Sequence, residues 1–227
     1  MKKTSIILFF TFSFYFAHAS LADSISTDTL TDAEISAYLD SVQSTFDFKT
    51  GMQTIGANLA TIHVPDSFVF LAGKDAQRLL TEIWSNPEDP SILGMLIPQN
   101  TSVLSENCWG IVYSYEEDGH VKDDDAESIN YDDLLKEMQE SILSGNAERM
   151  KAGYQKIELT GWAQKPYYDK AAHKLHWAKE LRFGEDSLHT LNYNIRVLGR
   201  EGVLVMNAVA GMNQFPDVQQ NIAKILA

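Results

Sequence analysis

Four consecutive strand-like runs fill the last third of the chain and constrain its fold more than any other feature. Short polar links that contain Pro166, Gly184 and Gly202 separate the runs, which read "YQKIELTGWAQ", "HKLHWAKELRF", "LHTLNYNIRVLG" and "GVLVMNAVAG". Links this short join antiparallel neighbours, whereas a parallel pair needs a long crossover. The runs therefore predict an antiparallel meander of four strands.

The rest of the chain predicts helices that flank this sheet. Apolar residues at helical spacing indicate helices at 31–47, 75–84, 131–143 and 216–227, and further strands are expected at 92–98 and 109–116. Thr31 and Glu34 form a capping box, and Pro216 lies in the first turn of the last helix. We expect a single α+β domain over residues 51–227, preceded by a helical preface over residues 23–50.

The N-terminus has the layout of a secretory signal peptide over residues 1–22. Lys2 and Lys3 precede an apolar run from Ile6 to Ala17, and small residues follow it. The run is short for a membrane span, although an uncleaved anchor is the alternative. The sequence predicts that the protein is exported. It would then lie in the periplasm or be anchored to the membrane on its periplasmic side.

The net charge argues against one class of partner, and the cysteine count excludes an internal disulfide. The net charge is −13, and removal of residues 1–22 takes away two lysines and no acid, which gives −15. A protein this acidic repels nucleic acid, so no nucleic-acid partner is expected. The single cysteine, Cys108, allows no internal disulfide and is expected to be a buried apolar residue.

Familiar catalytic motifs do not occur in the sequence. There is no G-x-S-x-G, P-loop, G-x-G-x-x-G or H-E-x-x-H pattern. No cofactor is expected, and an enzyme would need a dispersed site, with Asp124 or Asp169 as general acid or base near His173 or His176. On a strand those two histidines would point to opposite faces, so no metal site is predicted for them.

An acidic segment, residues 116–133, carries nine carboxylates and one lysine. Compared with a calcium loop that has Gly119 at its sixth position, the segment places Ser114 first and Asp125 twelfth. A calcium loop needs a carboxylate first and a glutamate twelfth, and it is entered from a helix. The match supports only weak calcium binding.

Two other interpretations of the acidic segment compete with the cation site. Asn130 is suited to cap the next helix, with carboxylates in its first turn, which would make the segment a solvated turn. The segment would otherwise face a protein partner, and its candidate binding residues are then Asp118, Asp123, Asp124 and Asp125.

Aromatic residues gather in "GWAQKPYYDKAAHKLHW" and suggest a second part of a binding face. Its candidates are Trp162, Tyr167, Tyr168 and Asp169. Such residues also pack sheets against helices, which is the alternative role. Nearby, Lys179 interrupts the apolar alternation of its strand, and Arg196 and Arg200 are suited to bind an anion or the protein's own carboxylates.

The sequence resembles the bacterial family called domain of unknown function 2167 over residues 51–210. The resemblance is carried in order by "LLTEIWSNP", "ILGMLIP", "WGIVYSYEEDGHVKDDDA", "INYDDLLKEMQ", "LTGWAQKPYYD", "HKLHWAKEL" and "LNYNIRVLGREGVLVMN". It implies an exported, envelope-associated protein with a membrane anchor, and it implies no established activity or catalytic residue. The meander and last helix also resemble the PsbP-like fold.

From these observations we expect a non-enzymatic module that binds an envelope or membrane protein. The acidic segment and the neighbouring aromatic residues would form its binding face. The alternatives are the dispersed carboxylate and histidine enzyme and the weak divalent-cation binder.

Overall fold

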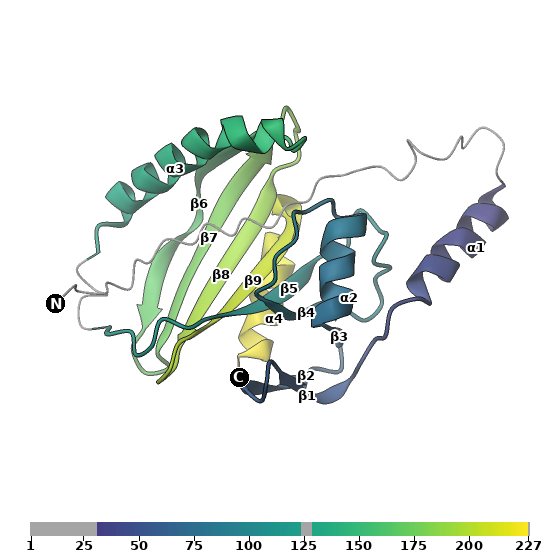
Figure 1. Cartoon of the computed structure of the whole chain (residues 1–227), viewed down its shortest axis with the longest axis horizontal. Coiled ribbons are helices and arrows are strands. Elements are labelled where there is room, and N and C mark those ends of the chain that lie inside the picture. Colours follow the sequence, from purple (N-terminus) through teal and green to yellow (C-terminus); the bar gives the residue numbers. More distant parts are fainter. Residues whose placement is uncertain (1–30, 124–128, 227) are drawn as a thin grey trace.

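One seven-stranded antiparallel sheet carries the fold (Figure 1). The structure, a computed structural model, describes residues 31–123 and 129–226. The strand order is β3-β4-β5-β9-β8-β7-β6. Together with the flanking helices, this sheet confirms the predicted α+β class.

The predicted four-strand meander is present and forms one side of the sheet. It consists of β6 (Ile157–Asp169), β7 (Lys174–Phe183), β8 (Thr190–Leu198) and β9 (Val203–Gly211). The expected link at Pro166 is wrong, because β6 continues through this residue. β6 is an edge strand with register shifts around Gln164, and proline is tolerated at such positions.

A second meander of three strands completes the sheet. It comprises β3 (Phe68–Ala72), β4 (Ile92–Pro98) and β5 (Gly110–Glu116). β5 pairs antiparallel with β9, so the last strand of each meander meets the other in the middle of the sheet. A separate hairpin, β1 (Gly51–Ile55) and β2 (Ala60–Val64), precedes β3.

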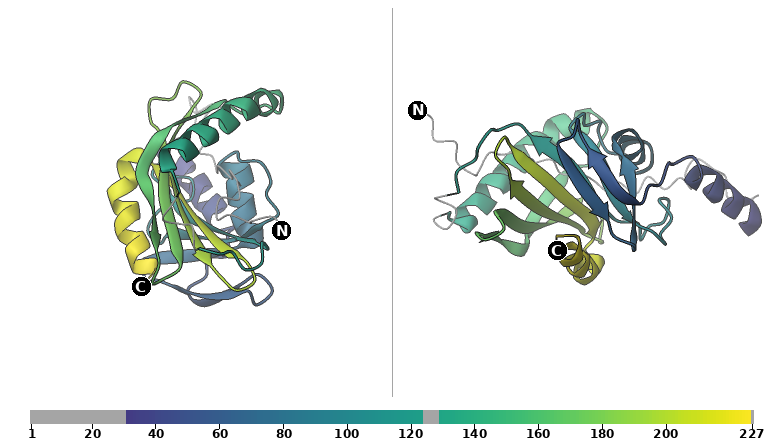
Figure 2. Two further views of the ribbon diagram at one scale, coloured as in Figure 1. Left: turned by 90° about the vertical axis from the view of Figure 1, so that its left-hand side faces the viewer. Right: turned by 90° about the horizontal axis from the view of Figure 1, so that it is seen from below.

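The two faces of the sheet carry different helices (Figure 2). α4 (Phe215–Ile225) lies on one face, where Val218 and Ile222 pack into the largest apolar core. The opposite face carries α2 (Gly73–Arg78), which continues into a π-helical turn, η3 (Leu79–Ile83). α3 (Tyr131–Lys151) packs on the same face as α2, over β6 at the far edge of the sheet.

The predicted helices differ from the observed ones in their bounds, and the helix expected over 31–47 ends at Gln43. The helix expected to end at residue 143 continues through Gly145 to Lys151, and Gly153, with a φ of 86°, follows its end. The helix expected at 75–84 begins at Gly73 and changes to π-helical bonding at Leu79. A short 3₁₀ turn, η5 (Met212–Gln214), leads from β9 into α4.

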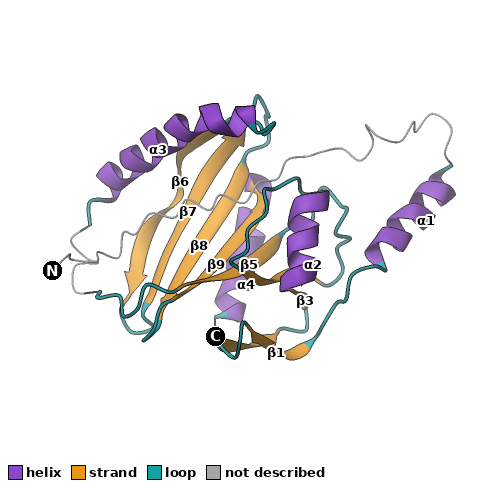
Figure 3. Cartoon of the chain, viewed as in Figure 1, coloured by secondary structure: helices purple, strands orange, loops and turns teal. Residues whose placement is uncertain are grey.

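α1 (Asp32–Gln43) forms the observed part of the predicted helical preface and lies at one end of the molecule (Figure 3). The Thr31–Glu34 capping box is confirmed. The Gln43 side chain accepts a hydrogen bond from Val103 N at 3.0 Å, which ties the end of α1 to the domain. The domain boundary at residue 51 stays a prediction, and the predicted signal peptide lies outside the described residues.

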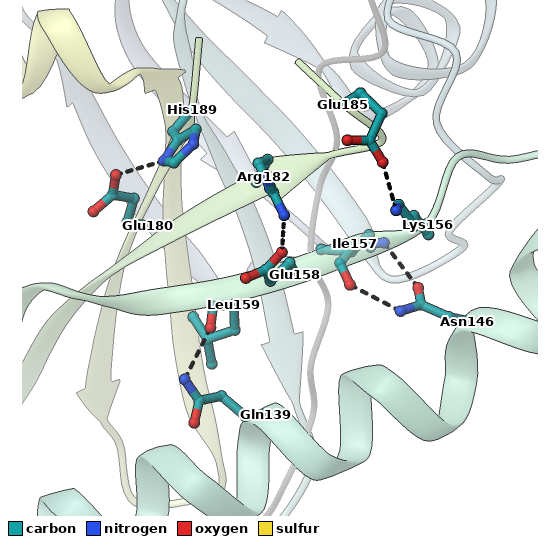
Figure 4. Close-up of polar contacts among 10 residues, drawn as sticks. All are labelled: Gln139, Asn146, Lys156, Ile157, Glu158, Leu159, Glu180, Arg182, Glu185 and His189. Atoms are coloured by element: carbon teal, nitrogen blue, oxygen red, sulfur yellow. Dashed lines mark hydrogen bonds and ion pairs between the residues drawn. The ribbon is translucent and has the colours of Figure 1, made fainter. Parts of the chain in front are cut away.

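Amide side chains of α3 bind the backbone of the edge strand β6 (Figure 4). Asn146 donates to Ile157 O and accepts from Ile157 N, both at 2.8 Å. Two turns of helix away, Gln139 donates to Leu159 O at 2.9 Å. These bonds satisfy backbone groups that an edge strand leaves unpaired, and they fix α3 over the sheet.

We expect Asn146→Ala to lower the free energy of unfolding by about 1–3 kcal/mol, because both backbone groups of Ile157 lose their partner. Urea denaturation measures this change. Ser141→Ala, an exposed substitution on the same helix, is the control and should change stability by less than about 0.5 kcal/mol. Equal stability of the two variants would contradict the assigned role of Asn146.

Candidate functional site

The acidic segment leaves β5 at Glu116 and is fixed at Asp123 to the turn between β6 and β7. Tyr168 donates a short hydrogen bond to Asp123 Oδ2, and His173 Nδ1 lies 3.2 Å from both Asp123 Oδ2 and the Tyr168 hydroxyl oxygen. Between these two points, Val121 is buried against the sheet. We call Asp123, Tyr168 and His173 the anchor cluster.

The electrostatics of the anchor cluster favour an ionised Asp123 and a protonated Tyr168. The hydrogen bond from Tyr168 is the main cause that lowers the pKa of Asp123, and contact with His173 lowers it further. Burial raises the pKa of Tyr168, and the neighbouring Asp123 raises it again. The cluster is therefore a charge-assisted contact that holds the acidic segment in place.

The other carboxylates of the acidic segment have different surroundings. Asp118 is exposed in the passage after β5. Glu116 is bound by Arg196, whose two terminal nitrogens donate to both carboxylate oxygens at 2.6 and 2.8 Å. Asp124 and Asp125 lie outside the described residues. Of the two roles considered for Arg196, the structure shows the contact with the protein's own carboxylate.

Asn130, near the end of the acidic segment, caps α3 as the sequence predicts. Asn130 accepts hydrogen bonds from the backbone N–H groups of Asp132 and Asp133. The two carboxylates lie in the first turn, where they face the positive end of the helix dipole.

Of the aromatic candidates, Tyr168 belongs to the anchor cluster, and Trp162 and Tyr167 lie elsewhere. Tyr167 and Tyr168 are adjacent on β6 and point to opposite faces, and the Tyr167 ring stacks on His176 at 4.7 Å. Trp162 donates to Tyr131 O and packs between α3 and the sheet. Asp169 accepts from the backbone of the following turn. Among the candidates that lie within the described residues, the structure brings Asp123 and Tyr168 together.

The cation hypothesis meets a competing contact in the structure. Glu116, the third position of the calcium register, is already chelated by Arg196. Within residues 31–123 and 129–226, no three histidine, cysteine, aspartate or glutamate side chains gather as metal ligands. His173 lies in the β6–β7 turn with φ of 51°, and His176 lies on the α4 face of β7.

A buried polar patch occupies the middle of the opposite sheet face, the one that carries α2 and α3. Trp177 on β7 pairs with Asn194 on β8, which pairs with Asn207 on β9, and Lys179 pairs with Asn192. Lys179 is 2% exposed, and all three asparagines are buried. We call these five residues the polar patch.

Several polar groups of the patch lack partners. Asn194 donates to the side-chain and backbone oxygens of Asn192, both at 3.0 Å. Asn192 Nδ2, Asn207 Oδ1 and Trp177 Nε1 have no hydrogen bond among the residues described. Buried polar groups in proteins are nearly always paired, so this concentration of unpaired groups is unusual.

Burial determines the ionisation of Lys179. It lowers the pKa of the ammonium to about 8, and repulsion from the nearby Arg196 contributes to the shift. Sequence reasoning did not assign a role to this lysine, although its interruption of an apolar alternation was the available signal.

Other buried residues fulfil their predicted structural roles. Cys108 is a buried free thiol just before β5, as expected.

Within the described residues, no helix has the length and apolar character needed to cross a membrane.

Comparisons with known proteins give a family and a fold neighbour. The sequence model of the family described as "Protein of unknown function (DUF2167)" matches residues 47–227. No curated protein matches the chain. The solution structure of cyanobacterial PsbP (CyanoP) from Synechocystis sp. PCC 6803 is similar at TM-score 0.42 and 8% identity, over 78% of this chain and 90% of that one. A similarity at this TM-score carries no argument about fold or function, and the PsbP-like expectation stays a prediction.

Replacement of Lys179 by methionine should stabilise the protein between pH 7.5 and 9.5. With a pKa of about 8 in the folded state and 10.5 in the unfolded state, the charged lysine costs about 3 kcal/mol below pH 8. The unfolded state binds the lysine proton between these values, so the contribution of Lys179 to wild-type stability rises with pH in this window.

Urea denaturation at several pH values measures the effect of this substitution. The advantage of Lys179→Met should shrink as the pH rises towards 9.5. The raised pKa values of Cys108 and of Tyr113 oppose the trend at the top of this window and above it, but they are common to both proteins and cancel in the stability difference. A constant stability difference across the window would contradict the assigned burial of the charge.

We expect Tyr168→Phe to raise the pKa of Asp123, because the carboxylate loses its strongest hydrogen-bond donor. Carboxyl-carbon NMR titration measures this pKa. Tyr167→Phe, on the other face of the same strand, is the control and should leave it unchanged. An unaltered Asp123 titration in Tyr168→Phe would show that the anchor cluster does not form.

Proposed function

The chain belongs to the DUF2167 family of proteins of unknown function, and on that premise we propose that it is an exported envelope domain that binds another protein. The module is non-enzymatic, and the acidic segment is the centre of its binding surface. The observation that carries this proposal is the anchor cluster, which holds an acidic passage at a defined place beside the β6–β7 turn.

Charge supports a partner with a basic surface. The acidic segment has a net charge of −8 within a chain whose net charge is −13. A segment this rich in carboxylates attracts a positive patch, accelerates association and selects against acidic surfaces. The same negative charge argues against a nucleic-acid partner.

Tyr167 supplies an aromatic contact on the α4 face of β6, opposite the face that holds the anchor cluster. Tyr167, at the end of β6, is 46% exposed and its ring is held by stacking on His176. Rigid, partly exposed tyrosines contribute strongly to protein interfaces. We assign Tyr167 as a separate aromatic contact for the partner, on the other face of β6 from the anchor cluster.

The proposed location rests on the N-terminal sequence and on the family resemblance. Lys2, Lys3 and the apolar run that follows support export, and the resemblance supports attachment to the membrane. A periplasmic or membrane-anchored position would place the acidic surface within reach of envelope proteins.

An enzyme with a dispersed site is the alternative, and the contact of Asp123 with His173 favours it. A carboxylate that orients an imidazole is a common catalytic arrangement. The His173 side chain, however, is 61% exposed, whereas catalytic groups usually line a cleft that excludes water. This exposure favours the binding function.

In-cell crosslinking of the tagged full-length protein tests the proposal. The triple variant Asp118→Lys, Asp124→Lys and Asp125→Lys should reduce capture of a specific envelope protein by about tenfold or more. Its melting temperature should change by no more than about 2 °C, because Asp118 is an exposed residue. Asp123 is left intact because it belongs to the anchor cluster.

The matched control reverses the same amount of charge elsewhere. Glu137→Lys, Glu140→Lys and Glu148→Lys alter exposed positions on α3 and should leave capture unchanged. An equal loss of capture in both triple variants would show that the effect comes from net charge alone. Full capture by the acidic-segment variant would overturn the proposal.

A further inference from the structure

We propose that the polar patch binds a small organic monoanion, a carboxylate that also carries a hydrogen-bond donor, with Lys179 as its counter-ion. The site lies on β7, β8 and β9, on the sheet face that carries α2 and α3. It is separate from the anchor cluster and does not depend on the proposed protein-binding function.

The first reason is the missing counter-ion of Lys179. A buried ammonium is normally paired with a carboxylate, since an isolated charge inside a protein is costly. Glu180, its neighbour in sequence, belongs to the other face and binds His189 at 2.6 Å (Figure 4). Glu116 is taken by both terminal nitrogens of Arg196. Among the described residues, no carboxylate is bonded to Lys179.

The second reason is the number of charges on this face. Arg196 is buried beside the patch, with its guanidinium 5.8 Å from the Trp177 ring, and Glu116 neutralises it. Lys179 then leaves one uncompensated positive charge. A monoanion restores neutrality, whereas a dianion would bring an excess negative charge into a buried site.

The third reason is the set of unpaired hydrogen-bonding groups. Asn192 Nδ2 and Trp177 Nε1 are free donors that match the two oxygens of a carboxylate. Asn207 Oδ1 is a free acceptor two strands away from Trp177 and matches a hydroxyl or amino group on the same ligand. One bound molecule with both features would satisfy all three groups.

The apolar neighbours of the patch favour a ligand with a carbon skeleton. Leu181 follows Lys179 on the same face of β7 and is fully buried. Val209 lies opposite Asn192 and is also fully buried. A short aliphatic chain would contact these side chains while its polar groups face the asparagines.

NMR titration of the full chain with three sodium salts at equal ionic strength tests the proposal. Lactate carries a carboxylate and a hydroxyl, propionate lacks the hydroxyl, and inorganic phosphate replaces the carboxylate. The indole N–H signal of Trp177 is the reporter, and Trp177→Phe identifies it among the four tryptophans.

Lactate should produce a saturable shift of the Trp177 indole signal. Propionate should bind about tenfold more weakly, because it lacks the hydroxyl and therefore one hydrogen bond. Phosphate should bind more weakly than lactate. Saturation by phosphate without any response to lactate would overturn the carboxylate assignment. No response to any of the three salts would overturn the site.

Two variants remove the site while retaining the fold. Lys179→Met deletes the charge and keeps the length of the side chain, and Asn192→Asp places a carboxylate opposite Lys179 as an internal counter-ion. Both should melt at a higher temperature than the wild type and lose the response to lactate. Lys170→Met, at an exposed turn position, should respond as the wild type does. An undiminished response in both site variants would contradict the proposal.

Discussion

The pairing of β5 with β9 is the constraint on which the rest of the structure depends. It joins two meanders that are each built from local contacts, and its register runs from Gly110 opposite Val209 to Glu116 opposite Val203. Without it the chain would have two small sheets with exposed edges. The same register brings Glu116 within bonding distance of Arg196, so the acidic segment starts from a fixed point on the sheet.

The two faces of this sheet serve different purposes. The α4 face is a continuous apolar core that extends from Ile55 in the hairpin to Ile222 in the last helix. The opposite face is apolar at its two ends, under α2 and α3, and polar in the middle. A buried polar centre between apolar regions is by itself unfavourable for folding. Such departures from the usual packing rules concentrate at functional sites.

Local sequence patterns predicted much of this architecture. The four-strand meander, the Thr31 and Asn130 caps and the burial of Cys108 all follow from periodicity or from capping chemistry within a few residues. The strand order did not follow, because the β5–β9 contact joins segments far apart in the chain. Pro166 was misread as a link because its tolerance depends on β6 being an edge strand, which only the complete sheet reveals.

The candidate sites were predicted only in part. Asp123 and Tyr168 were both named from sequence, but their contact spans 45 positions and no local pattern encodes it. In the sequence, Lys179 interrupts the apolar alternation of its strand. The alternation alone does not distinguish a bend in a strand from a buried charge. The cross-strand neighbours that make this lysine unusual, Asn192 foremost, lie on other strands.

Direct NMR titration of the Lys179 side chain, with carbon-13 and nitrogen-15 labelled lysine, tests most directly whether the sheet encloses an uncompensated cation. Lys179→Met identifies the signal. The structure predicts a midpoint near pH 8, set by burial and by the proximity of Arg196. A midpoint near 10.5, the value of a solvated lysine, would mean that the ammonium is hydrated or already paired, and the ligand site on the sheet would then have no basis.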